Sequence, residues 1–214
     1  AFRELFGITS EEQAKNLGIV QMNQVFEDKN GSGATVTVKE AAADQEQFYI
    51  LVEFAAPEGT VLPEPDQVEE GFNRAVLWGG PDGRGIGFGA YRDESCTSFI
   101  GSSEAGYAID YVEDSDPTDN KMEFIIRGHI DPMPKDAAYC LFSGIQSLCM
   151  QYQGEWVTML DGMDIDLIVP LVGMGTHYDF QGRCGVNLNG VTLAVAENLT
   201  ISPISVSMDL VIPD

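Results

Sequence analysis

Four cysteines and two histidines are the side chains with the greatest potential for covalent or metal chemistry: Cys96, Cys140, Cys149, Cys184, His129 and His177. A cysteine nucleophile needs a histidine within hydrogen-bonding reach, and a zinc site needs closely spaced cysteine or histidine ligands. The sequence contains no C-x-x-C pair and no H-x-x-x-H pair, and no motif brings a cysteine and a histidine together. We therefore predict no catalytic residues, no metal ligands, no cofactor and no enzymatic activity.

These six side chains are expected to serve the structure. His129 lies in a strand-like run, residues 125–130, which is typical of a histidine that is satisfied within the fold. The four cysteines allow three disulfide pairings. The sequence leaves open whether they are idle thiols or bridged pairs.

Two groups of aspartates are spaced closely enough to raise the question of calcium: Asp114, Asp116 and Asp119, and Asp161, Asp164 and Asp166. Calcium takes about six to eight oxygen ligands, and aspartates in one loop can supply several of them. Neither group has the D-x-[DN]-x-[DN]-G spacing with a distal glutamate that marks a calcium loop. We expect both groups to lie in charged loops that are exposed to solvent.

The tryptophans and one glycine-rich stretch are the remaining candidates for ligand binding. Trp78 and Trp156 each lie within two residues of a glycine, so each is either a core anchor at the end of a strand or part of a glycan platform. We favour the core anchor. The stretch Gly83–Gly89 lacks the Lys-Ser/Thr pair and the helix of a phosphate loop, so we predict a bent or bulged strand there.

Charge restricts the partners of this chain more strongly than any motif does. The 214 residues include 34 acidic and 11 basic side chains, which gives a net charge of −23. Such a surface repels phosphate backbones and anionic lipid headgroups, so we exclude nucleic acid as a partner. Hydrophobic residues make up 44% of the chain, which argues against a disordered acidic tail.

The sequence shows no targeting segment. No run of about 18 apolar residues occurs, so we predict no membrane span within the chain. Residues 1–6 lack the basic and apolar regions of a signal peptide. We expect either a cytosolic protein or a chain that begins after a removed export or anchor segment.

Hydrophobic periodicity predicts an all-β fold preceded by a short helix. Ser10 and Gln13 form a capping-box pattern, and Gly18 supplies a stop. Beyond it, short alternating runs are separated by glycine and proline, as in an antiparallel sandwich or barrel. The expected strands are residues 19–27, 34–39, 48–54, 74–78, 86–92, 107–112, 122–130, 138–142, 156–160, 165–172, 185–196 and 201–212.

The chain divides into an N-terminal helical segment, a first β-sandwich unit and the opening strands of a second β unit, at residues 1–18, 19–172 and 173–214. The second unit is suggested by an internal echo, because Gly33–Glu40 resembles Gly190–Glu197. The alternative, that two edge hairpins simply look alike, stays open. A segment of about 40 residues cannot bury a core alone, so it must pack on the first unit. Residues 114–120 have a linker-like composition and offer another boundary.

Three hydrophobic patterns along the chain occur together. They are Gly31–Val38 with Glu40, Asp44 and Phe48–Phe54; Gly154–Trp156 with Leu167–Leu171; and Val191–Leu193 with Ile201–Ser205. Together they resemble a domain of unknown function from the extracytoplasmic part of membrane-anchored, anti-sigma-factor-like proteins of Gram-positive bacteria. The resemblance covers most of residues 19–212. It implies immunoglobulin-like β-sandwiches outside the cell, behind a single membrane-spanning helix, and it implies no catalytic residues. The chain lacks the anchor and any sigma-factor-binding segment.

We therefore expect a non-catalytic, extracytoplasmic interaction or sensory module of a membrane-anchored, regulator-like protein. Its partner would be an unknown extracellular protein or cell-wall ligand, and it would reach the membrane only through a segment absent from this chain. The loops at residues 56–70 and 114–120 are the expected contact surfaces. A carbohydrate- or cell-wall-binding β-sandwich module is the alternative. A third class, a cysteine-dependent hydrolase, would require a thiol that reacts rapidly at neutral pH.

Overall fold

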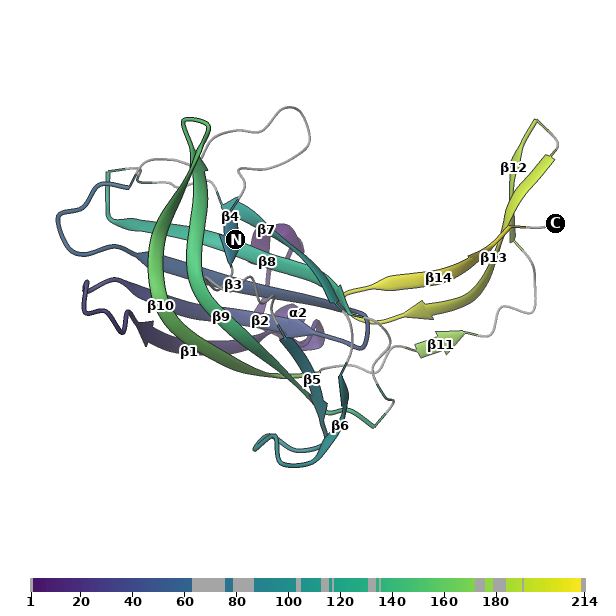
Figure 1. Cartoon of the computed structure of the whole chain (residues 1–214). Coiled ribbons are helices and arrows are strands. Elements are labelled where there is room, and N and C mark those ends of the chain that lie inside the picture. The colour runs from purple at the N-terminus through teal and green to yellow at the C-terminus, as the bar shows by residue number, and fades with distance from the viewer. Residues whose placement is uncertain are drawn as a thin grey trace.

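The computed structural model describes residues 2–62, 76–78, 87–102, 105–112, 116, 118–130, 134, 136–171, 176–178, 184–189 and 191–212. Within these ranges the chain forms two short helices and fourteen strands, which pair into three antiparallel sheets (Figure 1). The predicted fold class, an all-β antiparallel sandwich with a short N-terminal helical segment, is confirmed.

The N-terminal segment holds helices α1 (Phe2–Leu5) and α2 (Glu11–Asn16). The capping box is confirmed, because the Gln13 amide donates to Ser10 Oγ and the Ser10 amide donates to Gln13 Oε1, both at 3.2 Å. Gly18 follows with a φ of 72°, a conformation that glycine adopts without strain. The sequence did not indicate α1. Neither helix has the length and apolar composition needed to cross a membrane.

Sheet A contains five strands in the order β1 (Val20–Glu27), β2 (Thr35–Ala43), β3 (Gln47–Ala55), β8 (Lys121–Ile130) and β7 (Ala105–Val112). Strands β7 and β8 flank the alternative domain boundary at 114–120, and they pair with each other from Ala105 opposite Ile130 to Val112 opposite Glu123. The division of the chain into domains stays a prediction.

Sheet B contains β10 (Glu155–Pro170), β9 (Tyr139–Tyr152), β5 (Gly87–Tyr91) and β6 (Phe99–Ser102), with β4 (Val76–Trp78) also paired to β9. The sequence predicted two strands, 156–160 and 165–172, where the structure has the single strand β10. Bulges explain the difference, because the register with β9 shifts between Asp161 and Ile165 while strand pairing continues on both sides.

The inner faces of sheets A and B enclose the main hydrophobic core. Phe48 of β3 contacts Phe88 and Phe142 of sheet B, with ring centroids 5.4 and 4.9 Å apart. Gly128 of β8 lies against this group, since a Cβ atom there would be 2.5 Å from the Phe48 ring and 2.4 Å from the Gly106 carbonyl oxygen. The close approach of two strands and a phenyl ring therefore requires glycine.

A second, smaller cluster covers the outer face of sheet A. It consists of Phe2, Ala42, Leu51 and Ile125, with partly buried apolar neighbours that include Phe6, Tyr49 and Ile204. The Phe6 ring meets the Tyr49 ring edge to face at a centroid distance of 5.0 Å. This packing holds α1 against the sheet.

Sheet C is formed by β11 (Thr176–Tyr178), β12 (Cys184–Leu188), β13 (Val191–Ile201) and β14 (Val206–Val211). Strand β13 pairs with each of the other three strands. In Figure 1 these yellow strands extend away from sheets A and B. The turn at residues 202–205 joins sheet C to the sandwich, because Ser202 and Ser205 donate hydrogen bonds to Asp44 in the β2–β3 turn.

Candidate functional site

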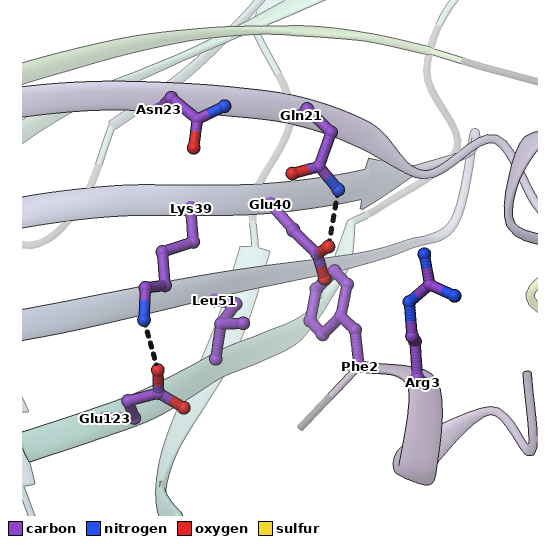
Figure 2. A pocket seen from close by; sticks show the side chains of 8 residues that line it. All are labelled: Phe2, Arg3, Gln21, Asn23, Lys39, Glu40, Leu51 and Glu123. Atoms are coloured by element: carbon purple, nitrogen blue, oxygen red, sulfur yellow. Dashed lines mark hydrogen bonds and ion pairs between the residues drawn. The ribbon is translucent and has the colours of Figure 1, made fainter. Parts of the chain in front are cut away.

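A pocket with a volume of about 310 Å³ lies on the outer face of sheet A beside α1 (Figure 2). Helix α1 and strands β1, β2, β3 and β8 all contribute to its lining: Phe2, Arg3, Gln21, Asn23, Lys39, Glu40, Leu51 and Glu123. We call it the α1 pocket. None of these residues was a candidate in the sequence, because they come from five separate elements and form no local motif.

Two β-bulges shape the α1 pocket. Strand β1 has an extra residue relative to β2 between Gln21 and Gln24, and β2 has one relative to β3 at Lys39. Asn23 lies in the first bulge with a φ of 49°, a left-handed conformation that asparagine tolerates better than most residues. The bulges therefore place Asn23 and Lys39 in the lining of the pocket.

A charged network forms one side of the α1 pocket. Lys39 Nζ donates to Glu53 Oε2 at 2.7 Å and also to Glu123, while Lys121 Nζ lies 3.3 Å from Glu53 Oε1. Burial alone would lower the pKa of Lys39, but the hydrogen bonds that its ammonium donates to Glu123 and Glu53 outweigh this effect and raise that pKa. Burial would likewise raise the pKa of Glu53, but Lys39 and then Lys121 lower it. Both groups therefore stay charged at neutral pH.

The other polar groups of the pocket are less fully engaged. Gln21 donates to Glu40 Oε1, and Arg3 forms an exposed ion pair with Glu11. The Asn23 side chain makes no hydrogen bond within the described part of the chain. The pocket thus presents two cations and two anions in a protein whose net charge is −23, so its own charge is balanced.

The cysteines whose side chains are described, Cys96, Cys140 and Cys149, are free thiols. Burial, and then the nearby Cys96, raises the pKa of Cys140 to about 12. Burial, and then the charge of Asp93, raises the pKa of Cys96. Thiols with raised pKa values stay protonated at neutral pH and react slowly. Cys149 lies within 3.5 Å of the Thr158 hydroxyl, and the side chain of Cys184 lies outside the described residues.

The histidines and tryptophans occupy separate strands. His129 is exposed on β8, rather than enclosed within the fold. Trp156 was expected to anchor the core, but it is 51% exposed near the tip of the β9–β10 hairpin. The reason is its register, because it pairs with Gln151 on the outer face of sheet B, whereas the neighbouring Met150 of β9 faces the core and is fully buried. His177 and Trp78 lie in β11 and β4, and their side chains are outside the described residues.

The described members of the two groups of closely spaced aspartates lie in a strand and in a turn. Asp161, Asp164 and Asp166 were predicted to lie in a loop, but all three belong to β10, where they alternate with the buried residues Met163, Ile165 and Leu167. In the other group, Asp116 accepts hydrogen bonds from Thr118 and Asp119 accepts one from the Lys121 amide, while Asp114 lies outside the described residues. Among the described side chains no three His, Cys, Asp or Glu residues gather as a metal site.

The predicted contact loops and the glycine-rich stretch are described only in part. In the first loop Ala56 and Leu62 are buried in the core and Val61 is exposed, while residues 63–70 lie outside the described ranges. Within Gly83–Gly89, residues 87–89 form the start of β5, which supports the predicted strand. The register of β5 with β6 then shifts between Ala90 and Tyr91.

Large apolar side chains gather on sheet C. Of the fourteen that the described part exposes, eight lie in residues 191–212. Val206, Met208 and Leu210 share one face of β14 and are 62%, 50% and 60% exposed. Ile201 pairs with Val206, and Ala196 with Leu210, so both extend this surface onto β13. We call these five residues the apolar face of sheet C.

Comparisons with protein-family models, with curated protein sequences and with solved structures found no match. The resemblance to the extracytoplasmic domain of anti-sigma-factor-like proteins therefore stays a prediction.

Proposed function

We propose that the chain is a non-catalytic, extracytoplasmic interaction module of a membrane-anchored, regulator-like protein, and that it recognises an extracellular protein. The observation that carries this proposal is the apolar face of sheet C, where three alternate side chains of β14 are at least half exposed. The apolar face of a sheet is normally buried against a second layer of structure. A large apolar patch that stays exposed therefore marks a site where another protein binds. The extracytoplasmic location and the membrane anchor rest on the family resemblance.

The charge of the chain indicates what kind of partner fits. An excess of 23 negative charges opposes association with a second copy or with another acidic protein. The partner is therefore a protein that places an apolar layer over the face and carries basic residues around it. The raised pKa values of Cys96 and Cys140 support a non-catalytic role, because neither thiol is prepared for nucleophilic attack.

Affinity capture with a matched pair of variants tests this proposal. Immobilised protein is exposed to solubilised cell-surface proteins of Gram-positive bacteria, and any partner is purified for a binding titration. Met208→Ser with Leu210→Ser should weaken binding at least tenfold, while Val25→Ser, at an exposed position on β1, should leave it unchanged. Equal affinity for all three proteins would refute the proposed surface, provided that their melting transitions coincide.

Carbohydrate or cell-wall binding is the second candidate, and the exposure of Trp156 favours it. Trp156 shares the outer face of sheet B with its partner Gln151 and with Thr158, so an aromatic ring and two polar side chains lie together on one surface. An aromatic ring can stack on the face of a sugar, while neighbouring polar side chains form hydrogen bonds with its hydroxyl groups. Tryptophan fluorescence titrated with soluble cell-wall fragments tests it: saturable quenching should be lost in Trp156→Ala and kept in Val157→Ala. An unchanged titration in Trp156→Ala would rule this platform out.

A further inference from the structure

Side-chain packing and strand pairing hold the walls of the α1 pocket in place. Phe2 is 1% exposed and Phe6 packs on Tyr49, so α1 is fixed against the outer face of sheet A. The remaining walls are strands paired in one continuous sheet. A pocket of about 310 Å³ that is formed in advance loses little conformational entropy on binding.

The charged groups of the α1 pocket disfavour a charged ligand. Lys39 is bonded to both Glu53 and Glu123, and Arg3 is paired with Glu11. An anion would have to draw these cations away from carboxylates that already neutralise them, and a cation at Glu123 would have to displace Lys39. Glu40 is the lining carboxylate whose partner is uncharged, the Gln21 amide. A neutral, polar ligand requires no such exchange.

The groups that remain free suit hydroxyls. Asn23 offers an amide that is both donor and acceptor, Glu40 has a second oxygen beyond the one that accepts from Gln21, and Arg3 has N–H donors besides the one bonded to Glu11. A hydroxyl group donates and accepts, so neighbouring hydroxyls can satisfy such a mixed set. Figure 2 shows Leu51 and Phe2 among these polar side chains, where they form the apolar part of the lining, with only 5% and 1% of their surfaces exposed.

We propose that the α1 pocket binds a neutral, polyhydroxylated ring, such as a monosaccharide or one sugar unit of a glycan. The volume is near the lower end of the range for small-molecule sites, roughly 300–1,000 Å³, which limits the bound part to one or two rings. This site is separate from Trp156, which lies on sheet B, and it does not depend on the apolar face of sheet C.

Amide chemical shifts of the whole chain measured by NMR provide the test. The probes are glucose, N-acetylglucosamine and chitobiose, with glycine as a zwitterion and inorganic phosphate as an anion. We expect saturable shifts at Gln21, Asn23 and Glu40 with at least one sugar, at concentrations on the order of millimolar to tens of millimolar, and none with glycine or phosphate. Tighter binding of chitobiose than of the single sugars would identify a glycan as the natural source, and equal binding would identify a free monosaccharide.

A pair of asparagine variants separates binding from folding. Asn23→Gly removes the free amide and relieves the positive φ, and it should weaken sugar binding by about fivefold without lowering the melting temperature. Asn189→Gly is the control. It also replaces an asparagine at a positive φ, 52°, but in the β12–β13 turn, and it should leave binding unchanged.

Three results would overturn the proposal: no saturable shift with any sugar, stronger binding of glycine or phosphate at the same amides, or sugar-induced shifts confined to Trp156 and its neighbours. The last result would support the second candidate function while rejecting the α1 pocket. Loss of protein capture in the Met208→Ser and Leu210→Ser variant bears only on sheet C, so failure of the two proposals can be told apart.

Discussion

The Ser205 hydroxyl donates a hydrogen bond to Asp44 Oδ2 at 2.6 Å across 161 residues of sequence. Asp44 is 2% exposed and also accepts hydrogen bonds from the amides of Glu46 and Gln47, at 2.7 and 2.6 Å. One buried carboxylate therefore organises the β2–β3 turn and binds the β13–β14 turn. Asp44 and Ser205 both lie in the patterns that carry the family resemblance, and the structure brings those patterns into contact.

We predict that Asp44→Ala loosens sheet C from the sandwich. Removing the carboxylate leaves buried donors without an acceptor, which costs about 1.5–3 kcal/mol of unfolding free energy. Denaturant unfolding measures this loss, and hydrogen exchange should accelerate most in β13 and β14.

A double-mutant cycle isolates the contact itself. Asp44→Ala combined with Ser205→Ala should give a coupling energy of about 0.5–3 kcal/mol, since the two side chains are bonded directly. The corresponding cycle with Ser207→Ala on β14 should show no coupling. Additive effects in the Ser205 cycle would mean that this hydrogen bond does not join the turns.

Gly128→Ala should destabilise the sandwich by at least about 1–3 kcal/mol, because the new methyl group would overlap the Phe48 ring and the Gly106 carbonyl oxygen. Gly106→Ala in the paired strand is the control, since a Cβ atom there meets nothing within 4 Å. Thermal melting of the two variants makes the comparison. Equal melting temperatures would contradict the close approach at Gly128.

Leu62→Ala should cost about 2–5 kcal/mol, since Leu62 is 6% exposed and belongs to the main core. Val61→Ala, at a position that is 66% exposed, should change stability by no more than about 0.5 kcal/mol. Chemical unfolding distinguishes the two. The predicted contact loop at 56–70 is therefore partly structural, and a deletion that includes Leu62 should impair folding.

Asp93 in the β5–β6 turn should keep its negative charge to a lower pH than an ordinary aspartate does. The hydrogen bond from the Ser95 hydroxyl, followed by that from the Thr97 amide, lowers the pKa of Asp93 from 3.8 to about 2. A carboxyl whose pKa is lower in the folded state stabilises the fold above its unfolded pKa, and this contribution is lost as the pH falls from about 4 to about 2. An NMR titration of the Asp93 carboxyl gives the pKa directly.

Variants of this turn provide the control. Asp93→Asn should reduce the acid-dependent loss of stability in that pH window, whereas Glu94→Gln, which removes a neighbouring exposed charge, should retain the Asp93 titration. A pKa of Asp93 near 3.8 in the folded protein would contradict the hydrogen bonding of the turn.

Cys140 should be inert in the folded protein. It is fully buried and its pKa is raised to about 12, so iodoacetamide should modify it at neutral pH only after denaturation. Mass spectrometry of alkylated peptides follows each cysteine separately. Rapid modification of Cys140 or Cys96 in the native state would revive the cysteine-dependent hydrolase.

The sequence by itself determined the fold class and the capped helix α2, because these follow from local periodicity and one capping pair. Strands such as β3 were predicted to within a residue at each end, since their alternation is uninterrupted. The alternation in 201–212 also indicated an apolar strand face, although not that this face would be exposed.

Only the tertiary structure decided where functional surfaces lie. The α1 pocket depends on bulges at Asn23 and Lys39, and a bulge changes which side chains share a face without leaving a clear signal in the sequence. Trp156 is exposed because its register with Gln151 places it on the outer face of sheet B, and Asp161–Asp166 is strand because β9 pairs across the bulges. Alternation shows that a strand has two faces, but distant segments of the chain determine which face is covered.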